Sequence, residues 1–137
     1  MQETEKPLSL VMFSGTDDKL TAASVLAVGA AAMGRPINIF LQYYALRAFR
    51  AGKVHADHAL AWEATESLSA VIRAHPGQHW SELLKQAKEV GEVNIQACAL
   101  SMDMFHLKHE DLDQLVDGIE GVAAFMASAS EGQVVFI

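Results

Sequence analysis

Residues 93–105, VNIQACALSMDMF, decide the fold that we expect for this chain. The first five residues form an apolar run typical of a buried strand, and the residues after Cys98 favour the start of a helix. A strand followed by a helix is the repeating unit of α/β proteins with a parallel sheet. The thiol of Cys98 then faces the partial positive charge of a helix N-terminus, which favours the nucleophilic thiolate. The alternative is that Cys98 is a small buried residue without chemistry.

The alternation of strands and helices extends in both directions from this stretch. Apolar runs predict four further strands, at residues 8–13, 37–41, 114–116 and 134–137. Helices are predicted at residues 17–33, 59–74, 81–90, 99–105 and 122–130, with a short helix or ordered loop at 42–49. Gly34 and Pro36 are expected to end the first helix. This order predicts an α/β protein with a mainly parallel, five-stranded sheet.

Polar or reactive residues follow three of the predicted strands. Ser14 and Gly15 follow the first strand, Tyr43 follows the second, and Cys98 ends the third. Parallel strands bring their carboxyl ends to one edge, where ligands of such folds bind. We therefore expect these residues to surround Cys98, whose thiol should open onto a solvent-reachable, electropositive notch. Tyrosines also pack at domain edges and subunit contacts, which is the alternative for Tyr43.

Cys98 and Ser101 form a C-x-x-S arrangement, one helical turn apart. The Ser101 hydroxyl is expected to donate to the thiolate or to cap the helix, and the N–H groups near Leu100 and Ser101 to stabilise anionic sulfur. His106, further along, is a candidate to reach the thiol or a substrate. The chain has one cysteine, so the site predicts a persulfide or a mixed disulfide with a partner.

The composition of the chain excludes several functional classes. The chain has 137 residues, of which 51% are hydrophobic, and its net charge of −7 makes nucleic acid a poor partner. The most apolar stretch, residues 25–33, is too short to cross a bilayer, and the N-terminus lacks a signal-peptide pattern. One cysteine fits a reducing compartment, so we expect a soluble cytoplasmic protein. We expect a flexible segment at residues 1–7 and one domain at residues 8–137.

The sequence lacks the patterns of common cofactor and metal sites. Residues 29–35 end a predicted helix instead of opening one, which argues against a phosphate-binding loop, and no G-x-G-x-x-G occurs. The histidines fall into pairs, at positions 55 and 58, 75 and 79, and 106 and 109, without zinc-ligand spacing. We therefore predict neither a cofactor nor a bound metal.

Four segments of the chain resemble one known family. Residues 97–104, ACALSMDM, are similar to the cysteine motif of the DsrE/DsrF-like sulfur-relay proteins, in the DsrE-related branch often labelled peroxiredoxin-like. Residues 13–19, 29–34 and 118–123 agree with that family in the same order. The resemblance implies a three-layer α/β/α fold with a five-stranded parallel sheet. It also implies a homo-oligomer and a cysteine, here Cys98, that accepts and passes on sulfane sulfur.

The resemblance implies partners for the chain, and the chain departs from the family pattern at one position. Small TusA-like sulfur carriers, or other persulfide proteins, are the implied acceptors. The family pattern has glycine where this chain has His106, so we expect a left-handed turn residue to be lost there. Such a change would alter the mouth of the site.

The resulting hypothesis is a sulfur carrier or sulfurtransferase. A small donor, namely polysulfide, thiosulfate or a persulfide, gives its outer sulfur to Cys98, and a partner thiolate removes it. Two alternatives stay open: a non-catalytic binding or assembly module, and a thiol peroxidase, for which the local sequence supplies no arginine. The residues also predict a homo-oligomer, because the terminal strand has no polar side chain after Gln133 and leaves an apolar edge.

Overall fold

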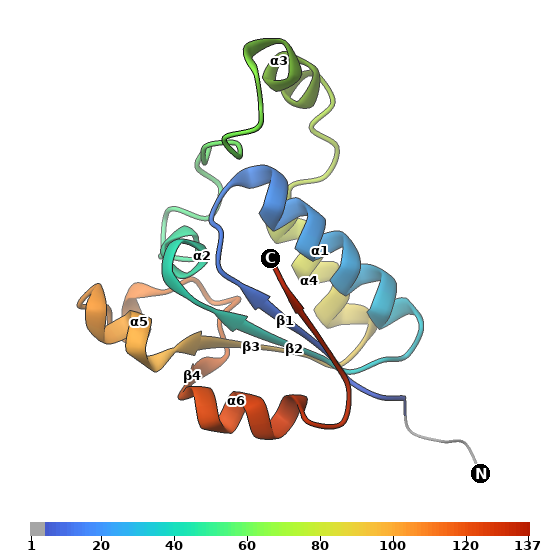
Figure 1. Ribbon diagram of the computed structural model, residues 1–137, viewed down its shortest axis with the longest axis vertical. Coiled ribbons are helices and arrows are strands. Elements are labelled where there is room, and N and C mark those ends of the chain that lie inside the picture. Colours follow the sequence, from blue (N-terminus) through green and yellow to red (C-terminus); the bar gives the residue numbers. More distant parts are fainter. Residues whose placement is uncertain (1–4) are drawn as a thin grey trace.

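Five short strands form a sheet at the centre of the protein (Figure 1). The computed structural model describes residues 5–137. The strands are β1 (Leu8–Met12), β2 (Ile37–Leu41), β3 (Val93–Cys98), β4 (Gly118–Glu120) and β5 (Gln133–Phe136). Strands β1 and β2 consist almost entirely of buried side chains, which follows from helices covering both faces of the sheet.

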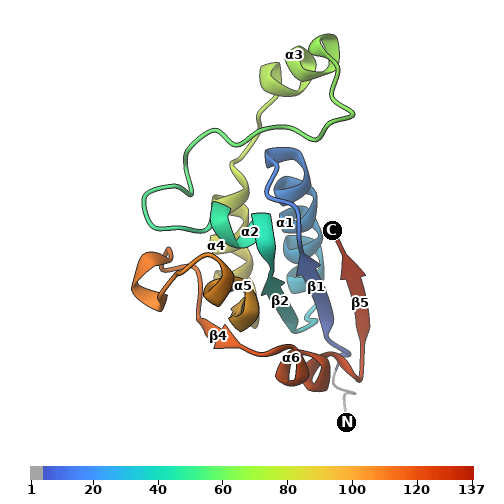
Figure 2. The ribbon, with the colours of Figure 1, turned by 60° about the vertical axis from the view of Figure 1, so that its left-hand side comes forward.

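All pairs of neighbouring strands are parallel, in the order β4-β3-β2-β1-β5. The helices are α1 (Asp17–Ala32), α2 (Tyr43–Ala48), α3 (Glu66–Ala74), α4 (Trp80–Val90), α5 (Ala99–Met104) and α6 (Val122–Ala129), with a 3-10 turn at His109–Asp111. Helices α1 and α4 pack together on one face of the sheet, and α6 lies on the other (Figures 1 and 2). The predicted three-layer α/β/α fold with a five-stranded parallel sheet is confirmed.

Alternate residues of the strands face two separate hydrophobic cores. The large core lies under α1 and α4 and includes Leu10, Ile39 and Ala97. The smaller one, called the α6 core here, consists of Val11, Phe40, Cys98, Phe125 and Ala129. The rings of Phe40 and Phe125 stack with their centroids 4.7 Å apart. This aromatic pair therefore joins α6 to β2.

Helix α1 begins and ends close to the predicted positions. Asp17 and Asp18 occupy its first turn, where carboxylates oppose the partial positive charge of the helix end. Gly34 has a φ of 79° just beyond the last turn, as expected for the left-handed residue that ends a helix. Small side chains let α4 approach closely: a Cβ on Gly91 would lie 3.3 Å from the Cβ of Ala31.

The predicted strand at residues 114–116 is wrong. Its apolar side chains pack into the large core from a loop, and β4 begins later, at Gly118. Asp117 fixes this start, because its N–H donates to the Ile95 carbonyl (2.7 Å) and its carboxylate accepts from the Ile95 N–H (2.8 Å). The pairing of β4 with β3 thus depends on a polar residue that the hydrophobic pattern does not mark.

The predicted helix at residues 59–74 is wrong in its first half, because only α3 is helical there. The backbone before α3 is used to hold the start of α1 instead. The Ala59 carbonyl accepts a hydrogen bond from Asp17 N (2.9 Å), and Ala61 N donates to the Asp18 carboxylate (3.2 Å). Burial pushes the pKa of Asp18 upward, but hydrogen bonds from Thr16, Ala61 and Lys19 outweigh it, so the pKa lies below its ordinary value.

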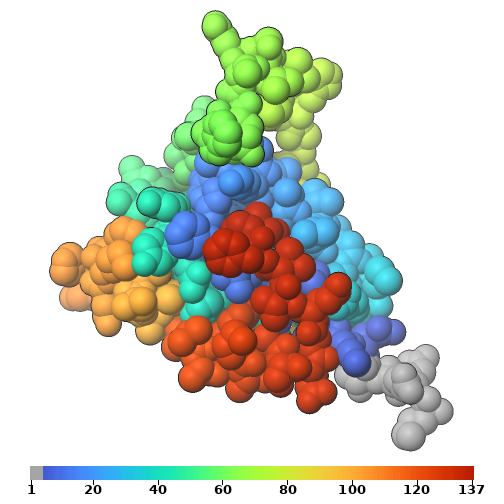
Figure 3. Space-filling model, in the orientation of Figure 1, coloured from blue at the N-terminus to red at the C-terminus, as the bar shows by residue number. Residues whose placement is uncertain are grey.

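Residues 50–79, called the arm here, project from the carboxyl edge of the sheet (Figures 2 and 3). Helix α3 lies in the arm and contributes no buried residue. The arm therefore depends on polar contacts near its base rather than on a core of its own. Among residues 5–137, no helix combines the length and hydropathy needed to cross a bilayer.

The predicted flexible segment, residues 1–7, falls partly outside the described residues, which begin at Glu5. Arg35 lies against the described part of it. The Arg35 guanidinium donates to the carbonyl of Lys6 (3.0 Å) and to that of Pro7 (3.4 Å). Gln133 N also donates to the Pro7 carbonyl (3.3 Å), so the chain is tied to β5 where it enters β1.

Candidate functional site

Cys98 lies at the carboxyl edge of the sheet, as predicted, but its side chain is buried. It is the last residue of β3 and the N-cap residue of α5. It is 5% exposed and belongs to the α6 core together with Phe40 and Phe125. The expectation of a solvent-reachable thiol is wrong for the single chain, because α6 covers this part of the sheet. The position of the thiol follows from its place at the end of β3, and its burial follows from the packing of α6 against that face of the sheet.

The charged residue beside Cys98 is acidic, so the expected electropositive notch is also wrong. Glu120 is the register partner of Cys98 in the parallel pair of β3 and β4. Side chains of paired residues point to the same face of a parallel sheet, on strands about 4.8 Å apart. Burial raises the pKa of the Glu120 carboxyl, since the charged form loses solvation there. Sequence reasoning missed Glu120 as a site residue.

Ser101 joins two turns of the backbone. Its buried hydroxyl oxygen accepts a hydrogen bond from the backbone N–H of Tyr43 (3.1 Å). Tyr43 has a φ of 44°, which is uncommon for a residue with a Cβ and needs such support. The predicted helix cap is wrong, because the N-cap residue of α5 is Cys98. The link between Tyr43 and Ser101 instead ties the end of β2 to the helix that follows Cys98.

Leu100 presents its side chain to solvent and is 65% exposed. Its backbone N–H lies in the first turn of α5, where the N–H groups of a helix have no partner within the helix. Leu100 therefore remains near the sulfur through its backbone only.

Ser14 and Gly15 lie at the same edge of the sheet but belong to a different hollow. This hollow, called the β1 hollow here, has a volume of about 350 Å³ and is lined by Ser14, Gly15, Thr16, Tyr44 and Arg47. Gly15 is required for it, because a Cβ at this position would collide with the carbonyl oxygen of Tyr44. Cys98 does not line the β1 hollow, so the structure does not bring these residues together around the thiol.

Tyr43 has a packing role at the edge of the sheet. The ring of Phe13 lies 4.8 Å from that of Tyr43, 5.6 Å from that of Tyr44 and 5.6 Å from that of Phe136, between centroids. These four side chains form an aromatic cluster over the carboxyl ends of β1, β2 and β5. Tyr43 therefore packs against other aromatic rings at the edge of the domain, as in the alternative role stated for it.

His106 is exposed and follows the end of α5, whereas the Cys98 thiol is buried in the α6 core, so the structure does not place the imidazole against the thiol. The φ of His106, 54°, lies in the left-handed region, so the expected loss of a left-handed turn residue is also wrong. The backbone of His106 takes the left-handed conformation that glycine favours, so the turn is kept.

Histidines of two different pairs meet at the base of the arm. The rings of His55 and His79 lie 5.4 Å apart, and His79 Nδ1 is 2.7 Å from the hydroxyl of Ser81. Burial, followed by the charge of His55, lowers the pKa of His79. Within residues 5–137, no three His, Cys, Asp or Glu side chains are arranged to hold a metal ion.

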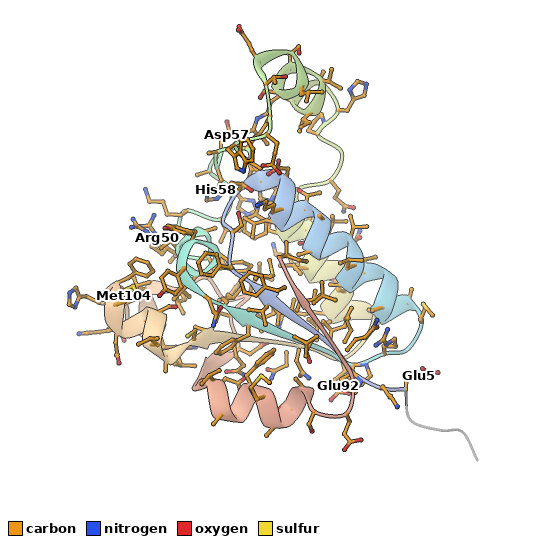
Figure 4. The ribbon with its side chains drawn as sticks, in the orientation of Figure 1. Glu5, Arg50, Asp57, His58, Glu92 and Met104 are labelled. Carbon is orange, nitrogen blue, oxygen red and sulfur yellow. The ribbon has the colours of Figure 1, made fainter. Side chains whose placement is uncertain are left out.

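A second hollow, of about 320 Å³, lies between the arm and the start of α1. The carboxylate of Asp17 joins the two parts, accepting hydrogen bonds from Arg73 (2.9 Å), Trp80 Nε1 (3.3 Å) and the backbone N–H of His58 (3.1 Å). The bond to Asp17 raises the pKa of the Arg73 guanidinium. Figure 4 shows His58 and Asp57 beside the first turn of α1. This hollow is built by the arm, and no single motif of the sequence marks it.

Comparison with known proteins identifies relatives over the whole described chain. A model of the DsrE/DsrF/DrsH-like family matches residues 4–64 and 55–137. An uncharacterized protein of Bacillus subtilis (strain 168), YrkE, is 30% identical over 158 residues, which cover 98% of this chain and 98% of that protein.

Two solved structures share the fold at low sequence identity. Protein MTH1491 of Methanobacterium thermoautotrophicum, described as of unknown function, superposes with a TM-score of 0.63 and 13% identity, covering 97% of this chain and all of that one. The E. coli protein YchN superposes with a TM-score of 0.59 and 14% identity, covering 97% of this chain and 99% of that one. At these identities the likeness concerns the fold.

Proposed function

We propose that this chain, since it belongs to the DsrE/DsrF/DrsH-like family, accepts sulfane sulfur on Cys98 as a persulfide and passes it to a partner protein. The observation that carries the proposal is the place of the one cysteine, at the strand end where parallel α/β sheets bind their ligands. The thiol lies at a helix start and within the α6 core, which suits a sulfur species that is shielded from water.

The proposed transfer needs no external oxidant or reductant. The thiolate of Cys98 attacks the outer sulfur of a donor R–S–SH, a bond forms between the two sulfurs, and the donor S–S bond breaks. The donor leaves as R–SH, and Cys98 carries the added sulfur. A partner thiolate then attacks that sulfur and restores the Cys98 thiol. The first N–H groups of α5, at Leu100 and Ser101, support the anionic sulfur in both steps.

The burial of Cys98 favours small donors. A thiol that is 5% exposed admits polysulfide, thiosulfate or a low-molecular-weight persulfide more readily than a folded protein. The acceptor that we propose is a TusA-like carrier or another persulfide protein. To reach the buried sulfur, either α6 moves away from the sheet or the acceptor cysteine lies on a mobile segment. A lone free cysteine is consistent with work in a reducing compartment, so we place this reaction in the cytoplasm.

Mass spectrometry after incubation with polysulfide tests the proposal. The wild-type protein should gain the mass of one sulfur atom, located by peptide mapping on Cys98, and a thiol acceptor should remove it. The Cys98→Ser protein should gain none, because a hydroxyl is a far weaker nucleophile than a thiolate. Sulfur uptake by Cys98→Ser equal to that of wild type would contradict the proposal.

The burial of Cys98 among apolar side chains also favours a second candidate, a binding or assembly module in which the thiol is incidental. Such a module would leave the thiol without added sulfur after exposure to each of the three donors. It would still bind its partner when Cys98 is replaced by serine. The same mass measurement, joined to a binding assay, therefore separates the two candidates.

We also propose that the chain assembles with copies of itself through the face that carries α6 and β5. Both elements carry exposed apolar side chains, of which Phe136 is 65% exposed, and the two segments lie side by side in Figure 3. The exposed members are Val122, Met126, Val134 and Phe136. Among the strands of residues 5–137, β5 pairs with β1 alone, so its outer edge is open as well. A second copy covers both features at once.

Light scattering coupled to gel filtration checks this assembly. The wild-type protein should elute as an oligomer, and Phe136→Asp should shift it to the monomer, because a buried unpaired carboxylate is costly at an interface. Val25→Asp is the matched control, since Val25 is exposed on α1, on the opposite side of the sheet. A monomeric wild type, or equal effects of the two substitutions, would rule out this interface.

A further inference from the structure

We propose that Glu120 is the group that takes the proton from the Cys98 thiol and returns it to the sulfur that leaves the donor. This inference rests on the proposed function and adds a second reacting side chain to it. Glu120 lies outside the C-x-x-S motif and reaches the site from the other side of a strand pair. Four features of the structure support the assignment.

The first feature is register. Cys98 and Glu120 are direct partners in the parallel pair of β3 and β4, so their side chains leave neighbouring strands on the same face. That face is the one covered by α6, because Cys98 belongs to the α6 core. The carboxyl group, on a side chain two methylenes long, is within reach of the sulfur across a strand spacing of about 4.8 Å.

The second feature is the space around the carboxyl group. Two register pairs earlier in the same ladder, and therefore on the same face, Gly118 faces Gln96. A Cβ on Gly118 would lie 2.8 Å from Oε1 of Gln96, so the Gln96 side chain lies over the glycine. Gln96 also donates to Oδ1 of Asn94 (2.9 Å). The Gln96 side chain therefore fills the space on the amino-terminal side of Glu120, and Cys98 is the neighbour of Glu120 at the carboxyl edge of the sheet.

The third feature is the lack of a competing partner. Among the hydrogen bonds and ion pairs of residues 5–137, none involves the Glu120 carboxylate. Helix α6, which packs over this face, has the sequence VAAFMASA and brings no titratable group. The sheet residues facing α6 from β2 and β3, Asn38, Phe40, Asn94 and Gln96, are uncharged. Asp103 on α5 is the other carboxylate near Cys98, and it is exposed.

The fourth feature is partial burial, which raises the pKa of Glu120. A raised pKa moves a carboxyl toward the range in which it both accepts and gives up a proton near neutral pH.

The proton and sulfur balance closes within the pair and the donor. The Glu120 carboxylate takes the proton of Cys98–SH, and the resulting thiolate attacks the outer sulfur of R–S–SH. As the donor S–S bond breaks, its electron pair goes to the inner sulfur, and Glu120 returns the proton to give R–SH. The net change is Cys98–SH plus R–S–SH to Cys98–S–SH plus R–SH, with no change in the protonation of Glu120.

The Glu120→Gln protein tests this role through two readouts that move in opposite directions. Alkylation of Cys98 by iodoacetamide needs only the thiolate. Removing a neighbouring negative charge removes its repulsion of the thiolate, so alkylation at pH 7 should be faster, by up to about tenfold. Sulfur uptake from a persulfide donor needs the proton transfer, so it should be slower by about tenfold or more.

Glu120→Asp and Asp103→Asn complete the comparison. The aspartate keeps the carboxyl group and should retain part of the uptake rate, whereas Asp103→Asn changes the charge by the same amount and should leave both rates as in wild type. Opposite changes in Glu120→Gln support the role of Glu120. The role is overturned if the alkylation and uptake rates of Glu120→Gln equal those of wild type, or if both rates fall together. In either case, sulfur uptake by the wild-type protein leaves the proposed function intact. A wild-type protein that takes up no sulfur defeats both.

Discussion

Replacing Phe125 with alanine should open the site and destabilise the protein at the same time. The substitution removes one ring of the stack with Phe40 and leaves a void over Cys98 in the α6 core. Loss of a buried phenylalanine costs about 3–5 kcal/mol. Because α6 is the layer that covers the thiol, alkylation of Cys98 by iodoacetamide should be faster by about tenfold or more, as expected when a covering element opens locally.

Leu26→Ala is the control for Phe125→Ala. Leu26 lies on α1, on the opposite side of the sheet from α6, and its side chain is exposed. Its truncation should leave the unfolding free energy and the alkylation rate close to those of wild type. Chemical denaturation and timed alkylation measure the two quantities. An alkylation rate unchanged in Phe125→Ala would show that the thiol is reached by a path that avoids α6.

Replacing Asp17 with alanine should release the arm from the rest of the protein. The carboxylate accepts hydrogen bonds from His58, Arg73 and Trp80, and Trp80 is fully buried. A buried donor left without an acceptor costs about 1–3 kcal/mol. Trypsin should therefore cut after Lys53 and Arg73 faster than in wild type, by about tenfold or more, because opening of the arm precedes cleavage.

Asp57→Ala is the control for Asp17→Ala. Asp57 is an exposed carboxylate in the arm, and no hydrogen bond to its side chain is found in residues 5–137. The loss of one negative charge is thus matched, and only the contacts differ. Mass spectrometry of the tryptic fragments identifies the sites of cleavage. Equal cleavage of the two variants would mean that Asp17 does not hold the arm.

The sequence predicted the elements whose signals are local. Strands β1 and β2 are runs of apolar residues, and Gly34 marks the end of α1 through its own backbone preference. β4 was not predictable in this way, because the apolar residues before it serve the large core and the strand itself has only three residues. The predicted first half of the helix at residues 59–74 failed for a related reason: backbone groups of Ala59 and Ala61 bind Asp17 and Asp18 instead of continuing a helix.

The candidate site was predictable in its position and not in its surroundings. Cys98 at a strand end follows from the chain alone. Its burial depends on α6, which returns to this face from residues far along the chain. Glu120 becomes its neighbour only through the register of β3 and β4. The segment at residues 118–123 contained the signal, since a glycine and a glutamate two positions apart share one face of a strand.

The described chain enters β1 at the amino edge of the sheet and ends at the opposite, carboxyl edge. Strand β5 runs parallel to β1, so Ile137 lies at the carboxyl edge, where its carbonyl accepts hydrogen bonds from the N–H groups of Phe13 (2.7 Å) and Ser14 (3.2 Å). Anything fused after Ile137 therefore emerges beside the aromatic cluster and the face that we assign to assembly. A purification tag or fluorescent reporter belongs ahead of β1, at the amino edge of the sheet, where it stays remote from the sulfur.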